Sequence, residues 1–211
     1  MRDEQPTVIV IDDDPEIRGA LESLLGSVGL KVMTLASVPE FFQHGRPKGP
    51  TCLVLDVRLP GPSGLELQRQ LAEANIHVPI IFMTGHGDVP MTVQAMKGGA
   101  IDFLVKPFRD QEMLDAVNQG LVRDRDRVEN EKLTETLRVR FETLSARERE
   151  VMAHVVSGRL NKQIAADMGI TEVTVKFHRG KVMRKMEASS QPELARMADR
   201  LNLVPGNTAR G

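Results

Sequence analysis

The sequence predicts an α/β domain with a five-stranded parallel, doubly wound sheet, then a helical linker and an all-α domain of four helices that contains a helix-turn-helix. Three observations predict this order. Short apolar runs alternate with amphipathic stretches over the first half of the 211 residues, a charge-rich stretch without proline or glycine follows, and glycines separate helical patterns in the last third. We expect domains at residues 1–120 and 143–211, joined by a linker at 121–142.

Five short apolar runs in the first half are expected to form the strands. They occupy residues 8–11, 32–35, 52–55, 80–83 and 101–105. The first, third and fourth are continuously apolar, which is typical of strands covered by helices on both faces. Helical patterns follow these runs at residues 15–28, 38–43, 64–74, 89–96 and from 111 onward. Repeated βα units of this kind predict a parallel sheet with right-handed crossovers and a functional site at the carboxyl ends of its strands.

The helical patterns carry local start signals. Asp14 precedes Pro15, and Ser63 precedes the helix expected from residue 64. Both are typical capping residues, and proline is favoured at the first helical position. The stretch from 111 to 142 predicts one long exposed helix, although Gly120 would also permit a break and a flexible connector.

Composition restricts the class of protein. Hydrophobic residues make up 41% and charged residues 27%, which is typical of a globular chain. The sequence has no run of about 18 apolar residues and no secretion signal at its acidic start, so we expect a cytoplasmic protein. Cys52 is the only cysteine, which excludes an intramolecular disulfide and argues against a cysteine-based zinc site.

The two halves of the chain differ in charge. Residues 1–120 hold 10 Lys and Arg against 16 Asp and Glu, a net charge of −6. Residues 121–211 hold 18 against 13, a net charge of +5. This division indicates two modules with different partners, and the basic module is a candidate for nucleic acid, although chance surface composition would give the same balance.

The predicted strand ends carry the side chains that indicate chemistry. Asp12 and Asp13 follow the first strand and Asp56 the third, while Thr84 ends the fourth and Lys106 the fifth. These side chains should meet at one edge of the sheet. Three carboxylates there repel one another unless a cation is present, and Mg²⁺ prefers such oxygen ligands. A carboxylate can also form an aspartyl-phosphate, with a lysine, a threonine and Mg²⁺ stabilising the transferred group.

This pattern, with Pro107 after Lys106, resembles the receiver domain of two-component response regulators over residues 7 to about 120. The stretches 84–91 and 99–103 are similar to the FixJ subgroup in particular. The resemblance implies a flavodoxin-like sheet of order 2-1-3-4-5. It also implies that Asp56 accepts a phosphoryl group from a phosphohistidine on a sensor histidine kinase.

The same resemblance implies the roles of the neighbouring residues. Asp13, Asp56 and the Arg58 carbonyl would hold Mg²⁺, with Asp12 acting largely through water. Thr84 would move onto the phosphoryl group and Phe103 would turn inward behind it, with Lys106 stabilising the added charge. Taken alone, each of these residues has an ordinary explanation as a turn, core or surface residue.

The last part of the chain predicts helices with clear start signals. Residues 145–148 and 190–193 have the pattern of capping boxes, which would open helices that end near 158 and 203. Asn161 is expected to cap a short helix over 162–168, and Thr171 one over 172 to about 186. This order of helix, glycine-containing loop and helix is typical of a helix-turn-helix. Residues from about 142 to 203 resemble the LuxR/NarL-type DNA-binding domain.

On the third of these helices, one side would pack against the core of the domain and the other would face DNA. We expect its core side to hold Val173, Val175, Val182, Met183 and Met186. The residues expected to bind DNA are Asn161, Lys162, Thr171, Thr174, Lys176, Phe177, Arg179, Lys181, Arg184 and Lys185. Phe177 is bulkier than the residue common in relatives and would suit a thymine methyl group, while Gly180 removes a side chain from the reading face. A helical protein-interaction domain is the alternative.

We therefore expect a phosphorylation-activated transcriptional regulator of a two-component system, and not an enzyme. Phosphorylation would alter the face formed by the fourth helix, fifth strand and last receiver helix, which would pair two copies of the chain on promoter DNA. One alternative is a phosphatase with an aspartyl nucleophile, which needs a second carboxylate two residues after Asp56, where the sequence has Arg58. Another is a DNA-binding or adaptor protein that works without phosphorylation.

Overall fold

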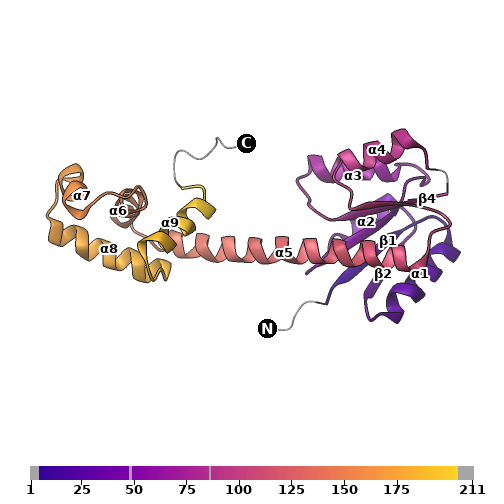
Figure 1. Cartoon of the computed structure of the whole chain (residues 1–211), viewed down its shortest axis with the longest axis horizontal. Helices are drawn as coiled ribbons and strands as arrows, with labels where there is room; N and C mark the ends of the chain where they lie inside the picture. Colours follow the sequence, from indigo (N-terminus) through magenta and orange to yellow (C-terminus); the bar gives the residue numbers. More distant parts are fainter. Residues whose placement is uncertain (1–4, 48, 86, 204–211) are drawn as a thin grey trace. The chain divides into compact units, whose positions relative to one another are not determined.

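The computed structural model describes residues 5–47, 49–85 and 87–203. The chain divides into two units between residues 129 and 130, inside the stretch expected to be the linker. The helix α5 (Asp110–Glu142) begins in the N-terminal unit and ends in the C-terminal unit, as Figure 1 shows. The linker is therefore helical, as predicted, and the expected domain boundaries stay predictions. No helix in the described ranges is long and apolar enough to cross a membrane.

The N-terminal unit is built on a parallel sheet. Its strands are β1 (Thr7–Ile11), β2 (Lys31–Leu35), β3 (Thr51–Asp56), β4 (Ile80–Thr84) and β5 (Asp102–Val105). They pair in the order β2-β1-β3-β4-β5, which confirms the predicted topology. The helices between them are α1 (Pro15–Ser27), α2 (Val38–His44), α3 (Gly64–Glu73) and α4 (Val89–Lys97).

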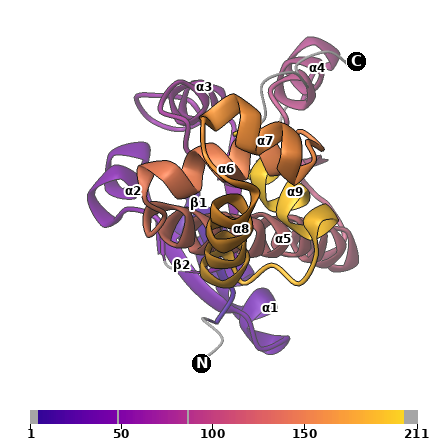
Figure 2. The ribbon, with the colours of Figure 1, turned by 90° about the vertical axis from the view of Figure 1, so that its left-hand side faces the viewer.

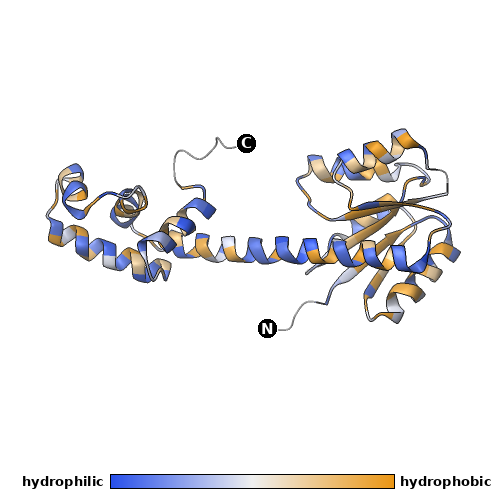
Figure 3. Ribbon diagram, viewed as in Figure 1, coloured by the Kyte–Doolittle hydropathy of each residue, from blue (hydrophilic) through white to orange (hydrophobic). Residues whose placement is uncertain are grey.

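The sheet has a hydrophobic core on each face. Ile9 and Ile11 of β1 point to the face covered by α2, α3 and α4, whereas Val8 and Val10 point to the face covered by α1 and α5. This alternation follows from the two-residue period of a strand, and it explains why β1 is apolar at successive positions. Figures 1 and 2 show α3 and α4 across the sheet from α1, and Figure 3 shows hydrophobic strands beside helices of mixed hydropathy.

The helix starts in this unit confirm the capping predictions. The carboxylate of Asp14 accepts a hydrogen bond of 2.8 Å from the amide of Glu16 at the start of α1. The hydroxyl of Ser63 accepts one of 3.2 Å from the amide of Glu66 at the start of α3. These bonds satisfy amide groups that have no partner inside the helix.

The helix α5 does not break at Gly120. A Cβ atom at this position would lie 2.6 Å from the Sγ of Cys52, so the absence of a side chain lets α5 pack closely against β3. One turn later, the fully buried Asp124 accepts hydrogen bonds from the Thr51 amide at 2.7 Å and from Arg46 at 2.5 Å. Arg127 also binds Asp124, at 2.9 Å. These contacts hold α5 on the N-terminal unit beyond residue 120.

Up to residue 203, where the description ends, the C-terminal unit packs four short helices and the end of α5 around one core. The helices are α6 (Ala146–Val156), α7 (Asn161–Met168), α8 (Glu172–Met186) and α9 (Gln191–Arg200). Their buried residues include Val151, Ile164, Val175 and Leu194. Figure 2 looks onto these helices. The predicted capping box of α6 is present, because Ser145 and Glu148 each accept a hydrogen bond from the other's amide.

Several local predictions for this unit are wrong. The short helix α7 begins at Asn161 itself, and the residue before it, Leu160, donates its amide to the side chain of Gln163. Ser190 does accept from the Glu193 amide, but the Glu193 carboxylate accepts from Ser189, so the capping box is not reciprocal. The helix α9 ends at Arg200 and not at Leu203.

Val173 is also misplaced by the sequence prediction. Its side chain is 76% exposed, while Val175, Val182 and Met186 are buried. Residues 173 and 175 are about 200° apart around a helix, so they cannot both face the same core. Val173 therefore lies on the outer face of α8.

Candidate functional site

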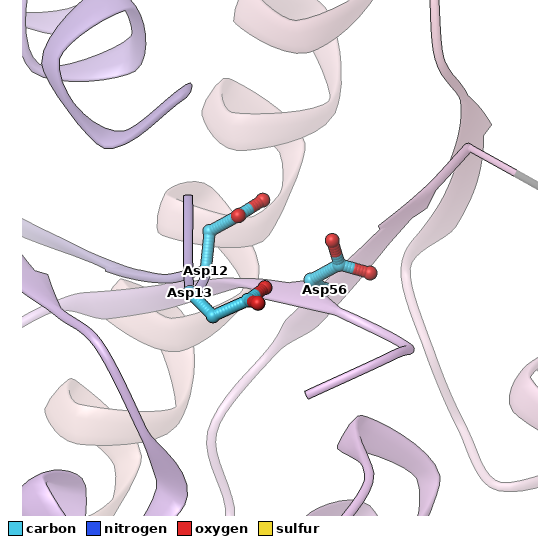
Figure 4. A group of neighbouring side chains, drawn as sticks. All are labelled: Asp12, Asp13 and Asp56. Atoms are coloured by element: carbon cyan, nitrogen blue, oxygen red, sulfur yellow. The ribbon is translucent and has the colours of Figure 1, made fainter. Parts of the chain in front are cut away.

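Three carboxylates meet at the carboxyl ends of β1 and β3. The side chains of Asp12, Asp13 and Asp56 each place an oxygen atom within 4.8 Å of the other two. Figure 4 shows the three carboxylates projecting into the same space, where a cation would reach all of them. Asp12 and Asp56 are buried and Asp13 is exposed, so the group is open to solvent on the Asp13 side. An all-oxygen set of this kind fits a hard divalent cation such as Mg²⁺.

Lys106 lies between two of these carboxylates. Its Nζ donates a hydrogen bond of 2.6 Å to Asp12 and one of 2.9 Å to Asp56. Lys106 follows β5, and its backbone amide donates to the Thr84 carbonyl at 2.8 Å, which continues the β4–β5 pairing to the edge of the sheet. The peptide bond from Lys106 to Pro107 is cis. The sheet topology thus brings together the four predicted strand ends.

Backbone amides fix the orientation of both buried carboxylates. The amide of Asp14 donates to the Oδ1 of Asp12 at 2.9 Å, and the amide of Arg58 donates to the Oδ1 of Asp56 at 2.9 Å. Each carboxylate therefore has one oxygen on a backbone amide and the other on Lys106. The Arg58 side chain is exposed, whereas its backbone lies at the site.

Burial and charge act on the pKa values of this group in opposite directions. Burial raises the pKa of Asp12 above its ordinary value, although the hydrogen bond from Lys106 acts to lower it. Burial acts to lower the pKa of Lys106, but its hydrogen bonds to Asp12 and Asp56 outweigh this and raise the pKa above its ordinary value. Lys106 thus stays charged across the neutral range, where it compensates the neighbouring carboxylates.

The predicted switch pair lies on β4 and β5. Thr84 is fully buried, and Phe103 is half-buried with its ring centroid 6.3 Å from that of Phe82. Sequence reasoning missed Gly87, which contacts this pair: a Cβ atom there would lie 3.1 Å from the Phe103 ring and 3.4 Å from Thr84 Cγ2. A single loop glycine gives no sequence signal for such a contact. Its neighbour His86, which belongs to the stretch 84–91, lies outside the described residues.

Gly64 is a second residue that the sequence analysis did not assign to the site. A Cβ atom at Gly64 would lie 2.3 Å from the carbonyl oxygen of Asp56. The first residue of α3 therefore lies against the end of β3, and its amide donates to the Val57 carbonyl at 3.0 Å. This close approach shapes the loop that carries Asp56 and Arg58.

The C-terminal unit presents a second candidate site on α8. The side chains of Lys176 and Arg184 are exposed, and neither makes an ion pair or a hydrogen bond with a described residue. Phe177 is 58% exposed, and the ammonium of Lys181 lies 4.4 Å from the centroid of its ring. Thr171 caps the helix by accepting from the Thr174 amide at 3.2 Å, and Lys162 is exposed near the start of α7. These residues form an exposed, mostly basic surface.

Other residues predicted to bind DNA make contacts within the unit. Arg179 donates to the side chains of Asn161 at 3.1 Å and Gln191 at 2.9 Å. Lys185 donates to Glu148 at 2.6 Å and to the Thr143 carbonyl at 2.8 Å. The Thr174 hydroxyl lies 2.9 Å from that of Thr171. The charge of Arg179 and Lys185 and their positions in the sequence do not reveal their side-chain partners, which come from α6, α7 and α9.

Comparison with known proteins matches each of the two units to a family. Residues 8–118 match the family described as response regulator receiver domain, and residues 142–198 match the family described as bacterial regulatory proteins, luxR family. The nodulation protein W of Bradyrhizobium diazoefficiens is 54% identical over 201 residues, which are 95% of this chain and 88% of that protein. The transcriptional regulatory protein FixJ of Azorhizobium caulinodans is 46% identical over 202 residues, which are 96% of each.

Solved structures agree with these matches. The response regulator StyR is similar with a TM-score of 0.83 and 45% identity, over 93% of this chain and 99% of that one. Full-length FixJ from B. japonicum is similar with a TM-score of 0.55 and 38% identity, over 94% of this chain and 98% of that one.

Proposed function

This chain belongs to the two-component response regulators of the FixJ/NarL type, and we propose that Asp56 is the residue through which phosphorylation controls it. The family regulates transcription in response to phosphorylation. The observation that carries the assignment of Asp56 is its position: it ends β3 beside Asp12 and Asp13, with the Lys106 ammonium 2.9 Å away. No other described carboxylates form such a cluster of three.

The chemistry is a phosphoryl transfer from a phosphohistidine of a sensor histidine kinase. An oxygen of Asp56 forms a bond to phosphorus while the phosphorus–nitrogen bond breaks, and the electron pair returns to the imidazole of the kinase. The Lys106 ammonium stabilises the charge that arrives on the phosphoryl oxygens. The Arg58 amide holds the carboxylate in position throughout.

The carboxylate group would also hold Mg²⁺. We assign Asp13, Asp56 and the Arg58 carbonyl as its direct ligands, with Asp12 acting through water. When bound, the cation would neutralise part of the negative charge on the phosphoryl group and on the carboxylates themselves. The fit rests on the all-oxygen donor set and on the spacing of the three carboxylates within 4.8 Å.

The signal would pass from Asp56 through Thr84 and Phe103. Thr84 would move its hydroxyl onto the phosphoryl group, and the Phe103 ring would turn inward into the space that Thr84 leaves. Because Gly87 lies against both side chains, movement of its loop would accompany this change. The result would be an altered surface over α4, β5 and the first part of α5.

That surface supports pairing of two copies of the chain. Val89, Val93 and Met96 on α4 and Val105 on β5 are exposed apolar residues, with Val89 77% exposed. Apolar residues gathered on one face of a protein mark an interaction surface. A homodimer would present two helix-turn-helix units to two half-sites, and linkage would raise the affinity for DNA without any new contact.

Promoter DNA would contact the outer face of α8 and the helix starts around it. We assign direct contacts to Lys162, Thr171, Lys176, Phe177, Lys181 and Arg184, all on the exposed surface described above. Asn161, Thr174, Arg179 and Lys185 would position this surface through their contacts within the unit. Because promoter DNA lies in the bacterial cytoplasm, we propose that the protein works there.

The test is the intact mass of the full chain before and after incubation with a small acyl phosphate and Mg²⁺. The wild type should gain one phosphoryl group, and EDTA should prevent the gain. Asp56→Asn should gain none, whereas Asp115→Asn, which changes an exposed carboxylate on α5, should behave as the wild type. An equal gain in Asp56→Asn would contradict the assignment. Sustained release of phosphate from a phosphomonoester would indicate a phosphatase.

A further inference from the structure

The outer face of α8 combines apolar and basic residues. At 3.6 residues per turn, positions 173, 177, 180 and 184 fall within about 60° of one another, opposite the buried Val175 and Val182. The residues at these positions are Val173, Phe177, Gly180 and Arg184. The centre of the outer face is therefore apolar over its N-terminal half, where a solvated helix would carry polar residues.

The apolar side chains on this face are largely exposed. Val173 is 76% and Phe177 58% exposed, and they are spaced four residues apart, which places them side by side on the helix surface. Lys176 and Lys181 flank them on the two sides. An apolar pair with a basic border is suited to a partner that presents apolar groups between negative charges.

The ring of Phe177 is held in a defined position. The Lys181 ammonium lies 4.4 Å from the ring centroid, and the His178 ring contacts it edge-on at 5.7 Å between centroids. A cation over the face of an aromatic ring is attracted by it, and the contact reduces the freedom of both side chains. Next to the ring, a Cβ atom at Gly180 would meet nothing within 4 Å, so a ligand can approach the helix backbone there.

From these observations, and resting on the proposed DNA contacts of α8, we propose that Val173 and Phe177 read the C5-methyl groups of two thymines in each half-site. Thymine is the one base of the four that presents an apolar group in the major groove. The two side chains are separated by about 6 Å along the helix axis, which corresponds to roughly two base steps of about 3.4 Å. The flanking lysines and Arg184 would then lie near the phosphates and neighbouring base edges.

The experiment begins with DNA sequences selected from a random duplex library by the phosphorylated full-length chain. Each thymine of the selected half-site is then replaced by deoxyuridine, which removes the methyl group and keeps the hydrogen-bonding pattern. We expect two thymines, no more than three base pairs apart, at which this replacement weakens binding about fourfold. That is the effect of about 0.8 kcal/mol for one buried methyl group.

Variants connect each methyl group to its side chain. In Phe177→Ala the difference between thymine and deoxyuridine should disappear at one of the two positions, and in Val173→Ala at the other. Val139→Ala is the matched control, because it truncates an exposed valine of α5 in the same unit and should leave both differences unchanged. Unfolding temperatures measured by circular dichroism should be equal for all variants, because the truncated side chains are exposed.

The outcomes separate this inference from the proposed function. If the phosphorylated wild type selects no sequence at all, the proposed DNA binding is wrong and the inference falls with it. If it selects a site but binds thymine and deoxyuridine equally at every position, the inference alone is overturned. If Phe177→Ala and Val173→Ala bind DNA normally but fail to activate transcription in vitro, the apolar pair contacts a protein and the inference is also overturned.

Discussion

Lys106 donates a hydrogen bond of 2.6 Å to Asp12, although the two residues are 94 positions apart in the sequence. Asp12 is only 1% exposed, so this ammonium is the positive charge that compensates a buried carboxylate. The same nitrogen lies 2.9 Å from Asp56. The residue that would stabilise the phosphoryl group thus also stabilises the site before any phosphoryl group arrives.

Replacing Lys106 with methionine should destabilise the N-terminal unit by about 1–3 kcal/mol at neutral pH, because a buried carboxylate loses its charged partner. Burial already raises the pKa of Asp12, and loss of the Lys106 hydrogen bond should raise it further. A group with a raised pKa favours the folded state at low pH and loses this effect as the pH rises through its folded pKa. The loss of stability of Lys106→Met relative to the wild type should therefore become smaller as the pH falls.

Thermal unfolding followed by circular dichroism measures this loss of stability between roughly pH 3 and pH 9, a range that includes the titration of carboxylates but not that of lysine. Lys97→Met is the control, because Lys97 is exposed at the end of α4. Added Mg²⁺ should recover part of the stability of Lys106→Met. A deficit that is constant over the whole pH range would show that the lost charge is not its cause.

The ion pair between Glu148 and Lys185 should stabilise the C-terminal unit. Glu148 is buried, its Oε2 accepts from Lys185 at 2.6 Å, and the hydrogen bond from Lys185 is the main cause that lowers its pKa to about 2. A lowered pKa stabilises the folded state above the unfolded value of 4.5, and this stabilisation is lost as the pH falls towards about 2. Glu148→Gln should cost about 2 kcal/mol at neutral pH and little near pH 2.

Urea unfolding of the full chain at several pH values distinguishes the loss of the Glu148–Lys185 ion pair from a general effect of removing a carboxylate. Glu150→Gln is the matched control on the same helix, since the Glu150 side chain is 52% exposed. It should change stability by less than about 0.5 kcal/mol. Equal effects of the two variants would mean that the Lys185 contact contributes nothing measurable.

Gly120→Ala should destabilise the N-terminal unit by about 1–3 kcal/mol through overpacking. The added Cβ would lie 2.6 Å from the Sγ of Cys52, which is itself buried. Combining it with Cys52→Ala should restore part of the loss, because the sulfur atom is removed. Gly19→Ala in α1 is the control: nothing lies within 4 Å of its Cβ, and it should be neutral or stabilise by up to about 1 kcal/mol. Equal destabilisation by Gly120→Ala with and without Cys52 would exclude this contact as the cause.

Lys176→Ala should affect DNA binding, whereas Lys185→Ala should affect stability. Lys176 is exposed, so its removal should weaken binding to a selected duplex about tenfold or more while the unfolding temperature stays the same. Lys185 binds Glu148 and the Thr143 carbonyl, so its removal should lower the unfolding temperature. Fluorescence anisotropy with a labelled duplex and circular dichroism measure the two quantities. A lower unfolding temperature for Lys176→Ala would show that it has a structural role instead.

Much of the site was predictable from the sequence. The apolar runs locate the strands to within one or two residues, and the order of βα units predicts the parallel sheet. Once the sheet is parallel, its strand ends share one edge, so Asp12, Asp56 and Lys106 must lie near one another. The cap at Asp14 and the capping box at Ser145 are equally local, because they depend on residues no more than three positions apart.

Other features depended on contacts between distant segments. In the sequence, Gly120 suggests a break in the helix. In the structure, the Sγ of Cys52 on β3 leaves no room for a side chain at this position of α5. The role of Gly87 beside Phe103, and that of Asp124 beside Thr51, likewise arise only when loops and helices meet the sheet.

Short-range periodicity and the order of the elements along the chain were enough to predict most of the secondary structure, the parallel sheet and the edge at which the carboxylates meet. The buried side of α8 was not predictable in this way, and neither were the exposure of Val173 and the inward contacts of Arg179 and Lys185. A helix of mixed polarity offers several possible buried faces. The helices α6, α7 and α9 that pack against it select one of them.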